Sequence, residues 1–155
     1  MTLDEHARHL GGLFANLQSL EFLLRVFLSR LPGARPMGVP HGTDIYSFPV
    51  GSELPDNDMT SYDSLTQLLA KFNREMKLRG APEIDDGLID LRDALAHGRV
   101  SAAVGDENLR LLKFDKPIDG KVRITFNEVM TEEWFTGQKA RVLAAIKQVY
   151  QQIEP

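Results

Sequence analysis

The strongest constraint on the fold is a leucine pattern in residues 3–31. Apolar side chains recur there at steps of three and four, which is the spacing that places them on one face of an α-helix. They are Leu10, Leu13, Leu17, Leu20, Leu24, Phe27, Leu28 and Leu31. Pro32 and Gly33 follow directly and end the pattern. We therefore predict one long amphipathic helix, whose apolar face has to be covered by other elements.

Three more helices are predicted downstream. Residues 32–60 are rich in Pro, Gly and Asp and are predicted to form a long loop with a short extended piece at residues 44–50. A second helix is expected over residues 61–78, a third from Pro82 to His97, and a fourth from Thr131 onward. The predicted inward faces are Leu65, Leu68, Leu69, Phe72 and Met76 in the second helix, and Leu143, Ile146, Val149, Tyr150 and Ile153 in the last.

The stretch between the third and fourth helices has a different period. The runs RVSAAV, NLRLLKF and KVRITF are short and β-prone, and Asp119-Gly120 is typical of a tight turn. We predict an antiparallel β-hairpin or three-stranded meander over about residues 99–128. The expected fold class is therefore mainly α: a four-helix bundle with a small β insertion between helices 3 and 4.

Composition narrows the functional classes. A length of 155 residues fits one domain spanning residues 1–155, and the absence of cysteine excludes disulfides and thiolate chemistry. The apolar segment of the first helix is interrupted by the charged residues Glu21, Arg25 and Arg30, so it is not expected to span a membrane. Because the N-terminal residues also do not resemble a secretory signal, we expect a cytoplasmic protein. The net charge of −4 argues against broad, non-specific nucleic-acid binding, although residues 99–123 carry six bases against four acids.

The third predicted helix carries the main candidate site. On a helical wheel Ile84, Leu88, Leu91 and Leu95 lie within about 60° of one another and form the core face. The opposite side gathers Asp86, Asp90, Asp93 and His97. Asp93 and His97 are four apart, so we expect the carboxylate to orient the imidazole.

Simpler explanations exist for the same residues. His97 followed by Gly98 is typical of a helix C-terminus, where a cation suits the dipole and glycine accepts a left-handed conformation. Arg92, at the edge of the apolar face, can be an ordinary surface arginine. Asp86, Asp90, Asp93 and His97 could also be metal ligands, but there is no second cluster of clear spacing, so no metal or cofactor is expected.

The string Arg92-Asp93-Ala94-Leu95-Ala96-His97 resembles the motif of the HEPN superfamily, which consists of an arginine, a polar residue directly after it, and a histidine a few positions later. The resemblance implies an HEPN-like helical bundle that dimerises through this region. It also implies a metal-independent endoribonuclease in a toxin or defence setting, with an antitoxin as a further partner. The polar position of this motif is frequently asparagine in the family, whereas this chain has Asp93 there.

The implied chemistry suits the residue types. His97, with a reference pKa of about 6.5, can act as base or acid in RNA cleavage. The planar guanidinium of Arg92 can hold phosphate oxygens, and Asp93 would orient His97 or a water. Because Arg92 and His97 are about 140° apart on an ideal helix, we expect a homodimer in which a second copy completes the site. The alternative is a non-catalytic HEPN-like dimer module that binds RNA, a nucleotide or a protein.

Several other residues are candidates for supporting roles. Glu21 lies within the leucine stripe and needs a partner, which is either Arg25 or Arg92. The basic residues of the β region are candidate RNA contacts, with a solvated sheet face as the alternative; they are Arg99, Arg110, Lys113, Lys121 and Arg123, with Lys116 nearby. His6, His9 and His41 are expected to be solvated.

Overall fold

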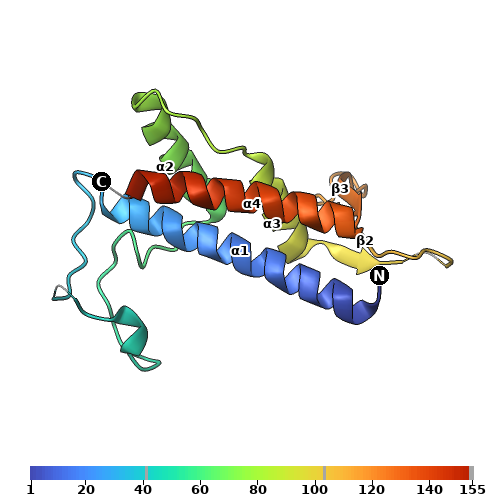
Figure 1. The fold of residues 1–155 in the computed structure, drawn as a ribbon, viewed down its shortest axis with the longest axis horizontal. Coiled ribbons are helices and arrows are strands. Elements are labelled where there is room, and N and C mark those ends of the chain that lie inside the picture. Colours follow the sequence, from blue (N-terminus) through green and yellow to red (C-terminus); the bar gives the residue numbers. More distant parts are fainter. Residues whose placement is uncertain (41, 103, 154–155) are drawn as a thin grey trace. The chain divides into compact units, whose positions relative to one another are not determined.

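The computed structural model describes residues 1–40, 42–102 and 104–153, and the protein is mainly helical with one small antiparallel sheet (Figure 1). In chain order its elements are α1 (Leu3–Ser29), a 3-10 helical turn (Ile45–Ser47), α2 (Leu65–Leu78), α3 (Gly87–His97), β1 (Arg99–Ser101), β2 (Arg110–Phe114), β3 (Ile124–Val129) and α4 (Glu132–Ile153). The predicted fold class, mainly helical with an antiparallel sheet between the third and fourth helices, is confirmed at this level.

The chain forms two compact units. The first contains residues 1–20 and 85–147, and so holds the beginning of α1, all of α3, the sheet and most of α4. The second contains residues 21–84 and the C-terminal segment that begins at Gln148, and so holds the end of α1, the long loop and α2. The candidate motif on α3 therefore belongs to the first unit.

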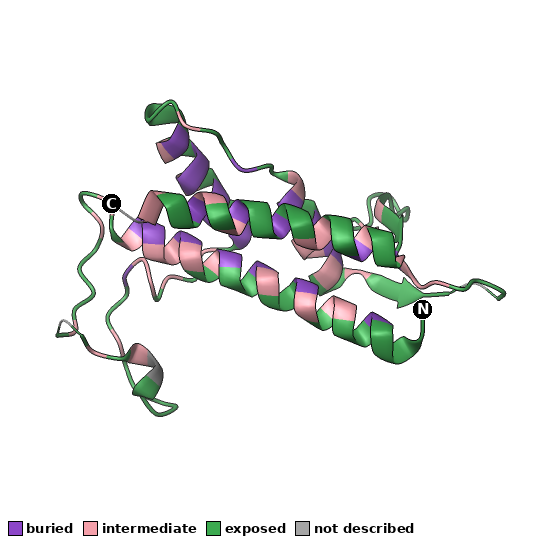
Figure 2. Ribbon diagram, in the orientation of Figure 1, coloured by how far each residue is buried: buried purple, intermediate pink, exposed green. Residues whose placement is uncertain are grey.

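In the second unit, α2 begins later than predicted because Ser64 caps it. The Ser64 hydroxyl accepts from the Gln67 amide at 3.4 Å, and the Gln67 side chain accepts from the Ser64 amide at 2.8 Å. This reciprocal capping box fixes the helix start at Leu65 rather than near residue 61. The predicted inward face of α2 is confirmed as buried (Figure 2).

The loop over residues 32–60 is tied together by one asparagine. Asn57 is buried; its Nδ2 donates to the carbonyl of Met37 at 3.1 Å, and its Oδ1 accepts from the Met59 amide at 2.8 Å. The expected extended piece at residues 44–50 is wrong, because Ile45–Ser47 is a 3-10 helical turn closed by the Ser47 amide donating to the Asp44 carbonyl.

The third helix begins later than its predicted start at Pro82. Asn73 of α2 donates from its Nδ2 to the Ile84 carbonyl at 2.9 Å and accepts from the Ile84 amide at 2.8 Å. A helix starting at Pro82 would pair the Ile84 carbonyl with the Leu88 amide, but Asn73 binds this carbonyl and the Leu88 amide donates to the Asp85 carbonyl instead. Residues 81–85 have no regular secondary structure, and the helix begins at Gly87.

The first unit contains the sheet, with strand order β1-β2-β3 and antiparallel pairing throughout. Arg99 pairs with Leu112 across β1 and β2, and Arg110 pairs with Val129 across β2 and β3. The predicted turn at Asp119-Gly120 is confirmed, since both residues have positive φ, 51° and 72°. The third strand begins at Ile124, later than expected. The pairing of β2 with β3 also has a register shift between Lys113 and Phe114.

The buried face of α4 agrees with the predicted one only in part, because Val149 is buried as predicted but Leu143 and Tyr150 are not. The helix starts as expected after Thr131, whose hydroxyl accepts from the Trp134 amide at 3.0 Å. The residues that pack inward are Phe135, Val142, Ala145 and Val149. Leu143 and Tyr150 are exposed, at 44% and 49%. The apolar stripe of α4 is wide enough to offer two faces, and packing selected the one that contains the large ring of Phe135.

The N-terminal histidines are not solvated as expected. His6 is only 6% exposed and meets the Phe135 ring edge-on at 5.3 Å, while His9 stacks on the same ring at 5.2 Å. Burial lowers the pKa of His6, and the charge of His9 lowers it further. His41 lies outside the described residues.

Candidate functional site

The candidate site is built on α3, which is fixed at its start by Asp85. The Asp85 carboxylate accepts from the Gly87 amide at 2.9 Å and from Arg141 of α4 at 2.5 Å. These hydrogen bonds lower the pKa of Asp85, the one from Arg141 most strongly. Leu88, Leu91 and Ala94 then form the buried face. Leu95, predicted to be core, is only half-buried, because Ala94 takes the inward position in the last turn.

Asp93 forms the centre of a small ion-pair cluster at the surface of α3. Its Oδ1 lies 3.7 Å from a guanidinium nitrogen of Arg92, and its Oδ2 lies 3.6 Å from the ammonium of Lys113 on β2. The side chains of Arg92 and Asp93 are 33% and 40% exposed, so each pair contributes little to stability, about 1 kcal/mol or less. The cluster therefore places two cations beside one partly exposed carboxylate.

His97 is exposed at the last position of α3. Within residues 1–40, 42–102 and 104–153, no hydrogen bond or ion pair joins Asp93 to His97. The expectation that Asp93 orients His97 is therefore wrong for this conformation. The reason is the neighbouring strand, which brings Lys113 to the carboxylate and which helix spacing alone could not reveal.

Gly98 ends α3 in a way that the sequence did not predict. Its backbone is extended, with φ −75° and ψ 174°, so the left-handed cap expected from the His97-Gly98 pair is wrong. Glycine is required here by space. A Cβ on Gly98 would lie 2.3 Å from the Ala94 carbonyl oxygen and 2.9 Å from Leu111 Cδ1 on β2. The close approach of helix and strand leaves room only for hydrogen, and it fixes the position of His97.

The predicted RNA-contact residues separate into three groups. Lys113 belongs to the Asp93 cluster. Arg99 and Arg110 lie on the sheet: the Arg99 guanidinium sits 5.3 Å from the centre of the Phe114 ring, and Arg110 donates to Asn127 Oδ1 at 2.6 Å. Sequence reasoning missed Phe114 and Asn127, although the alternation of Arg110, Leu112 and Phe114 was a usable signal for one shared face.

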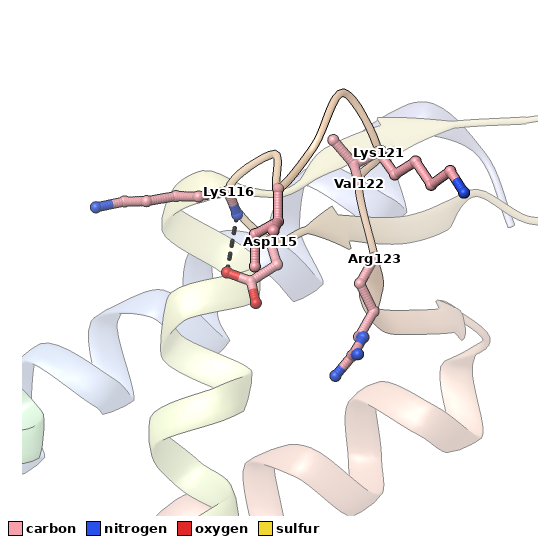
Figure 3. A pocket seen from close by; sticks show the side chains of 6 residues that line it. Asp115, Lys116, Lys121, Val122 and Arg123 are labelled. Carbon is pink, nitrogen blue, oxygen red and sulfur yellow. Dashed lines mark hydrogen bonds between the residues drawn. The ribbon is translucent and has the colours of Figure 1, made fainter.

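Lys121 and Arg123 line a pocket of about 420 Å³ at the β2–β3 turn, together with Asp115, Lys116, Ile118 and Val122 (Figure 3). The Asp115 carboxylate accepts from the Lys116 amide at 2.8 Å. The charged ends of Lys116, Lys121 and Arg123 point in three different directions (Figure 3). Since these cations diverge, the pocket does not form a convergent anion site.

Glu21 lies in the second unit, where Arg25 is its partner one turn later, with 3.9 Å between the guanidinium and the carboxylate. Arg25 also donates to the Asp63 carbonyl at 2.7 Å, which ties α1 to the segment before α2. The expected pairing with Arg25 is confirmed. A pairing of Glu21 with Arg92 stays a prediction.

The metal-site interpretation of Asp86, Asp90, Asp93 and His97 is not supported. In the part of the chain that the structure describes, no group of three or more histidine, aspartate or glutamate side chains is arranged to hold a metal ion. None of the helices described there combines the length and the apolar character needed to cross a bilayer.

Comparison with known proteins gives no assignment. No protein-family model matches the sequence, and no curated protein or solved structure is significantly similar to it. The HEPN resemblance therefore rests on the motif of α3 and its helical setting alone.

Proposed function

We propose that the protein is a metal-independent endoribonuclease of HEPN type. The observation that carries this proposal is the placement of an exposed His97 at the end of the helix that also carries the Arg92–Asp93–Lys113 cluster. An accessible imidazole and two cations on neighbouring elements are the groups that RNA cleavage without a metal needs.

In the proposed reaction, one His97 takes the proton from a ribose 2′-hydroxyl, and the 2′-oxygen attacks the adjacent phosphorus. The bond from phosphorus to the 5′-oxygen breaks, and an acid protonates the leaving 5′-oxygen. Arg92 and Lys113 stabilise the charge that builds on the non-bridging oxygens. The products are a 2′,3′-cyclic phosphate and a 5′-hydroxyl, so atoms and protons balance.

The acid is the His97 of a second copy in a homodimer, which gives each site one base and one acid. Asp93 holds Arg92 and Lys113 near each other before RNA arrives, rather than orienting the histidine. The resemblance further suggests a toxin or defence setting, in which an antitoxin would cover the same α3 surface.

Two observations favour the alternative, a non-catalytic HEPN-like module that binds RNA, a nucleotide or a protein. Asp93 is engaged by two cations and makes no hydrogen bond or ion pair with His97 in the described residues, and the net charge of the chain is −4. A binding site of this kind would depend on Arg92 and Lys113 and tolerate loss of the imidazole.

The experiment that separates the two is cleavage of mixed-sequence RNA in EDTA. Wild type is compared with Arg92→Ala, His97→Gln and Arg8→Ala, the last being an exposed arginine of α1 outside the motif. The proposal predicts cyclic-phosphate ends from wild type and Arg8→Ala only. RNA that stays intact, but binds wild type and His97→Gln equally and Arg92→Ala weakly, identifies the binding module.

A further inference from the structure

We propose that the open face of the β1–β2–β3 sheet is a stacking platform that binds single-stranded RNA. The inference rests on the proposed function, because it names the form of RNA that the α3 site receives. Antiparallel register places one set of strand side chains on this face: Arg99, Ser101, Arg110, Leu112, Phe114, Ile124, Asn127 and Val129. We call these residues the platform.

The two faces of the sheet have different surroundings. Leu111 of β2 is buried, and Lys113, two residues along the same strand, faces Asp93 of α3, so the helix covers this face around β2. Val100 and Glu128, on the flanking strands of the same face, stay exposed. The platform face stays accessible: Ile124 is 53% exposed, Arg99 and Asn127 are exposed, and Phe114 is half-buried. A face that combines apolar and cationic side chains in this way, with an aromatic ring at its edge, is open to a ligand.

Phe114 and Arg99 supply the contacts that a nucleobase needs. The Arg99 guanidinium lies 5.3 Å from the Phe114 ring centre, which pairs a flat cation with a flat aromatic surface. Unpaired bases stack on aromatic rings and on guanidinium planes, and they do so with little dependence on base identity. Ile124 pairs with Phe114 across the strands and extends the apolar floor beneath a stacked base.

Charge selects a polyanion as the occupant. The platform carries two arginines and no carboxylate among its eight positions, although the chain as a whole has a net charge of −4. Arg110 is held by Asn127 at 2.6 Å, which aims its guanidinium along the same face. Two cations beside an apolar floor match a strand that presents phosphates on one side and bases on the other.

The platform also begins where the proposed site ends. Arg99 follows His97 by two residues, with Gly98 fixing the turn between α3 and β1. A strand laid over β1 and β2 therefore leads toward His97. A duplex cannot use this surface in the same way, because its bases are stacked inside the helix and show no free faces.

The test measures binding by fluorescence anisotropy in the His97→Gln background, in which the bound RNA stays uncut. The probe is a short mixed-sequence RNA, used as a single strand, as a duplex with its complement, and as single-stranded DNA of the same sequence. Phe114→Leu removes the ring but keeps apolar bulk, and Arg99→Lys keeps the charge but removes the plane. Phe126→Leu is the matched control, since Phe126 pairs with Lys113 and lies on the opposite face.

We expect single-stranded RNA to bind more tightly than the duplex. Phe114→Leu should weaken that binding by about 5- to 160-fold, the range for loss of one stacked base. Arg99→Lys should weaken it as well, and Phe126→Leu should leave it unchanged. Circular dichroism verifies that the variants are folded. If Phe114→Leu does not fold, Arg99→Lys still tests the platform.

Absence of binding, equal affinity for duplex and single strand, or equal losses in Phe114→Leu and Phe126→Leu would each overturn the platform. Tighter binding of the DNA strand would overturn RNA as its ligand. Cleavage assays with wild type, which has His97, test the ribonuclease separately from the platform. If RNA binds in a way that depends on Phe114 but is not cleaved, the ribonuclease is refuted and the platform is retained. If RNA is cleaved but its binding does not depend on Phe114, the platform is refuted and the ribonuclease is retained.

Discussion

Replacing Gly98 with alanine is expected to destabilise the protein, because the added methyl group has no space. The backbone of Gly98, at φ −75° and ψ 174°, is allowed for alanine, so the cost is steric. The new Cβ would meet the Ala94 carbonyl oxygen at 2.3 Å, Leu111 Cδ1 at 2.9 Å and the Leu112 carbonyl oxygen at 3.2 Å. Two of these three atoms are backbone and cannot rotate away.

Overpacking of this kind costs about 1–3 kcal/mol, which lowers the Tm of a chain of this size by about 2–12 °C. Thermal unfolding followed by circular dichroism measures it. The matched control is Gly137→Ala in α4, where nothing lies within 4 Å of the added Cβ and helix propensity predicts a gain of about 0.5–1 kcal/mol. If Gly98→Ala were as stable as Gly137→Ala, α3 would not abut β2 as described, and the fixed position of His97 would be lost with it.

Three further changes test other parts of the structure. His6 has a lowered pKa, so the unfolded chain binds more protons below about pH 6.5; wild type should lose stability as pH falls below that value, and His6→Leu should lose less in urea unfolding at matched pH. Asn73→Ala leaves both backbone groups of Ile84 without their partner and should cost about 2–4 kcal/mol in the same assay, whereas an unchanged midpoint would refute the role given to Asn73. Arg110→Ala should reduce the slope of log affinity against log salt for single-stranded RNA by about 0.7, and an unchanged slope would show that Arg110 meets no phosphate.

Local patterns in the sequence were sufficient for most of the elements. The leucine spacing of residues 3–31 predicted α1, and the Asp119-Gly120 pair predicted the β2–β3 turn. These features depend on residues a few positions apart, so they can be read from one segment at a time.

The errors came from contacts between distant segments. Asn73 occupies the backbone of Ile84 and delays α3 by several residues, although Pro82 is a good helix start by local rules. In α4, two apolar faces were available, and only packing around Phe135 decided between them. His6 is polar and near the chain start, yet the same ring buries it.

The candidate site shows the same division. Sequence placed Arg92, Asp93 and His97 on one helix, with Asp93 and His97 on the side away from the core, but it paired Asp93 with His97. The structure pairs Asp93 with Lys113, which is 20 positions away and is brought there by the register of β2. The Arg99–Phe114 contact arises from the same register.

The most direct test of the central claim is the chemistry of the RNA ends. Mixed-sequence RNA is incubated with wild type and with His97→Gln in EDTA, and the 3′ ends of the fragments are identified by mass spectrometry. The account predicts 2′,3′-cyclic phosphates that form with wild type and disappear with His97→Gln. Intact RNA with folded wild type, or identical fragments from both proteins, would contradict it.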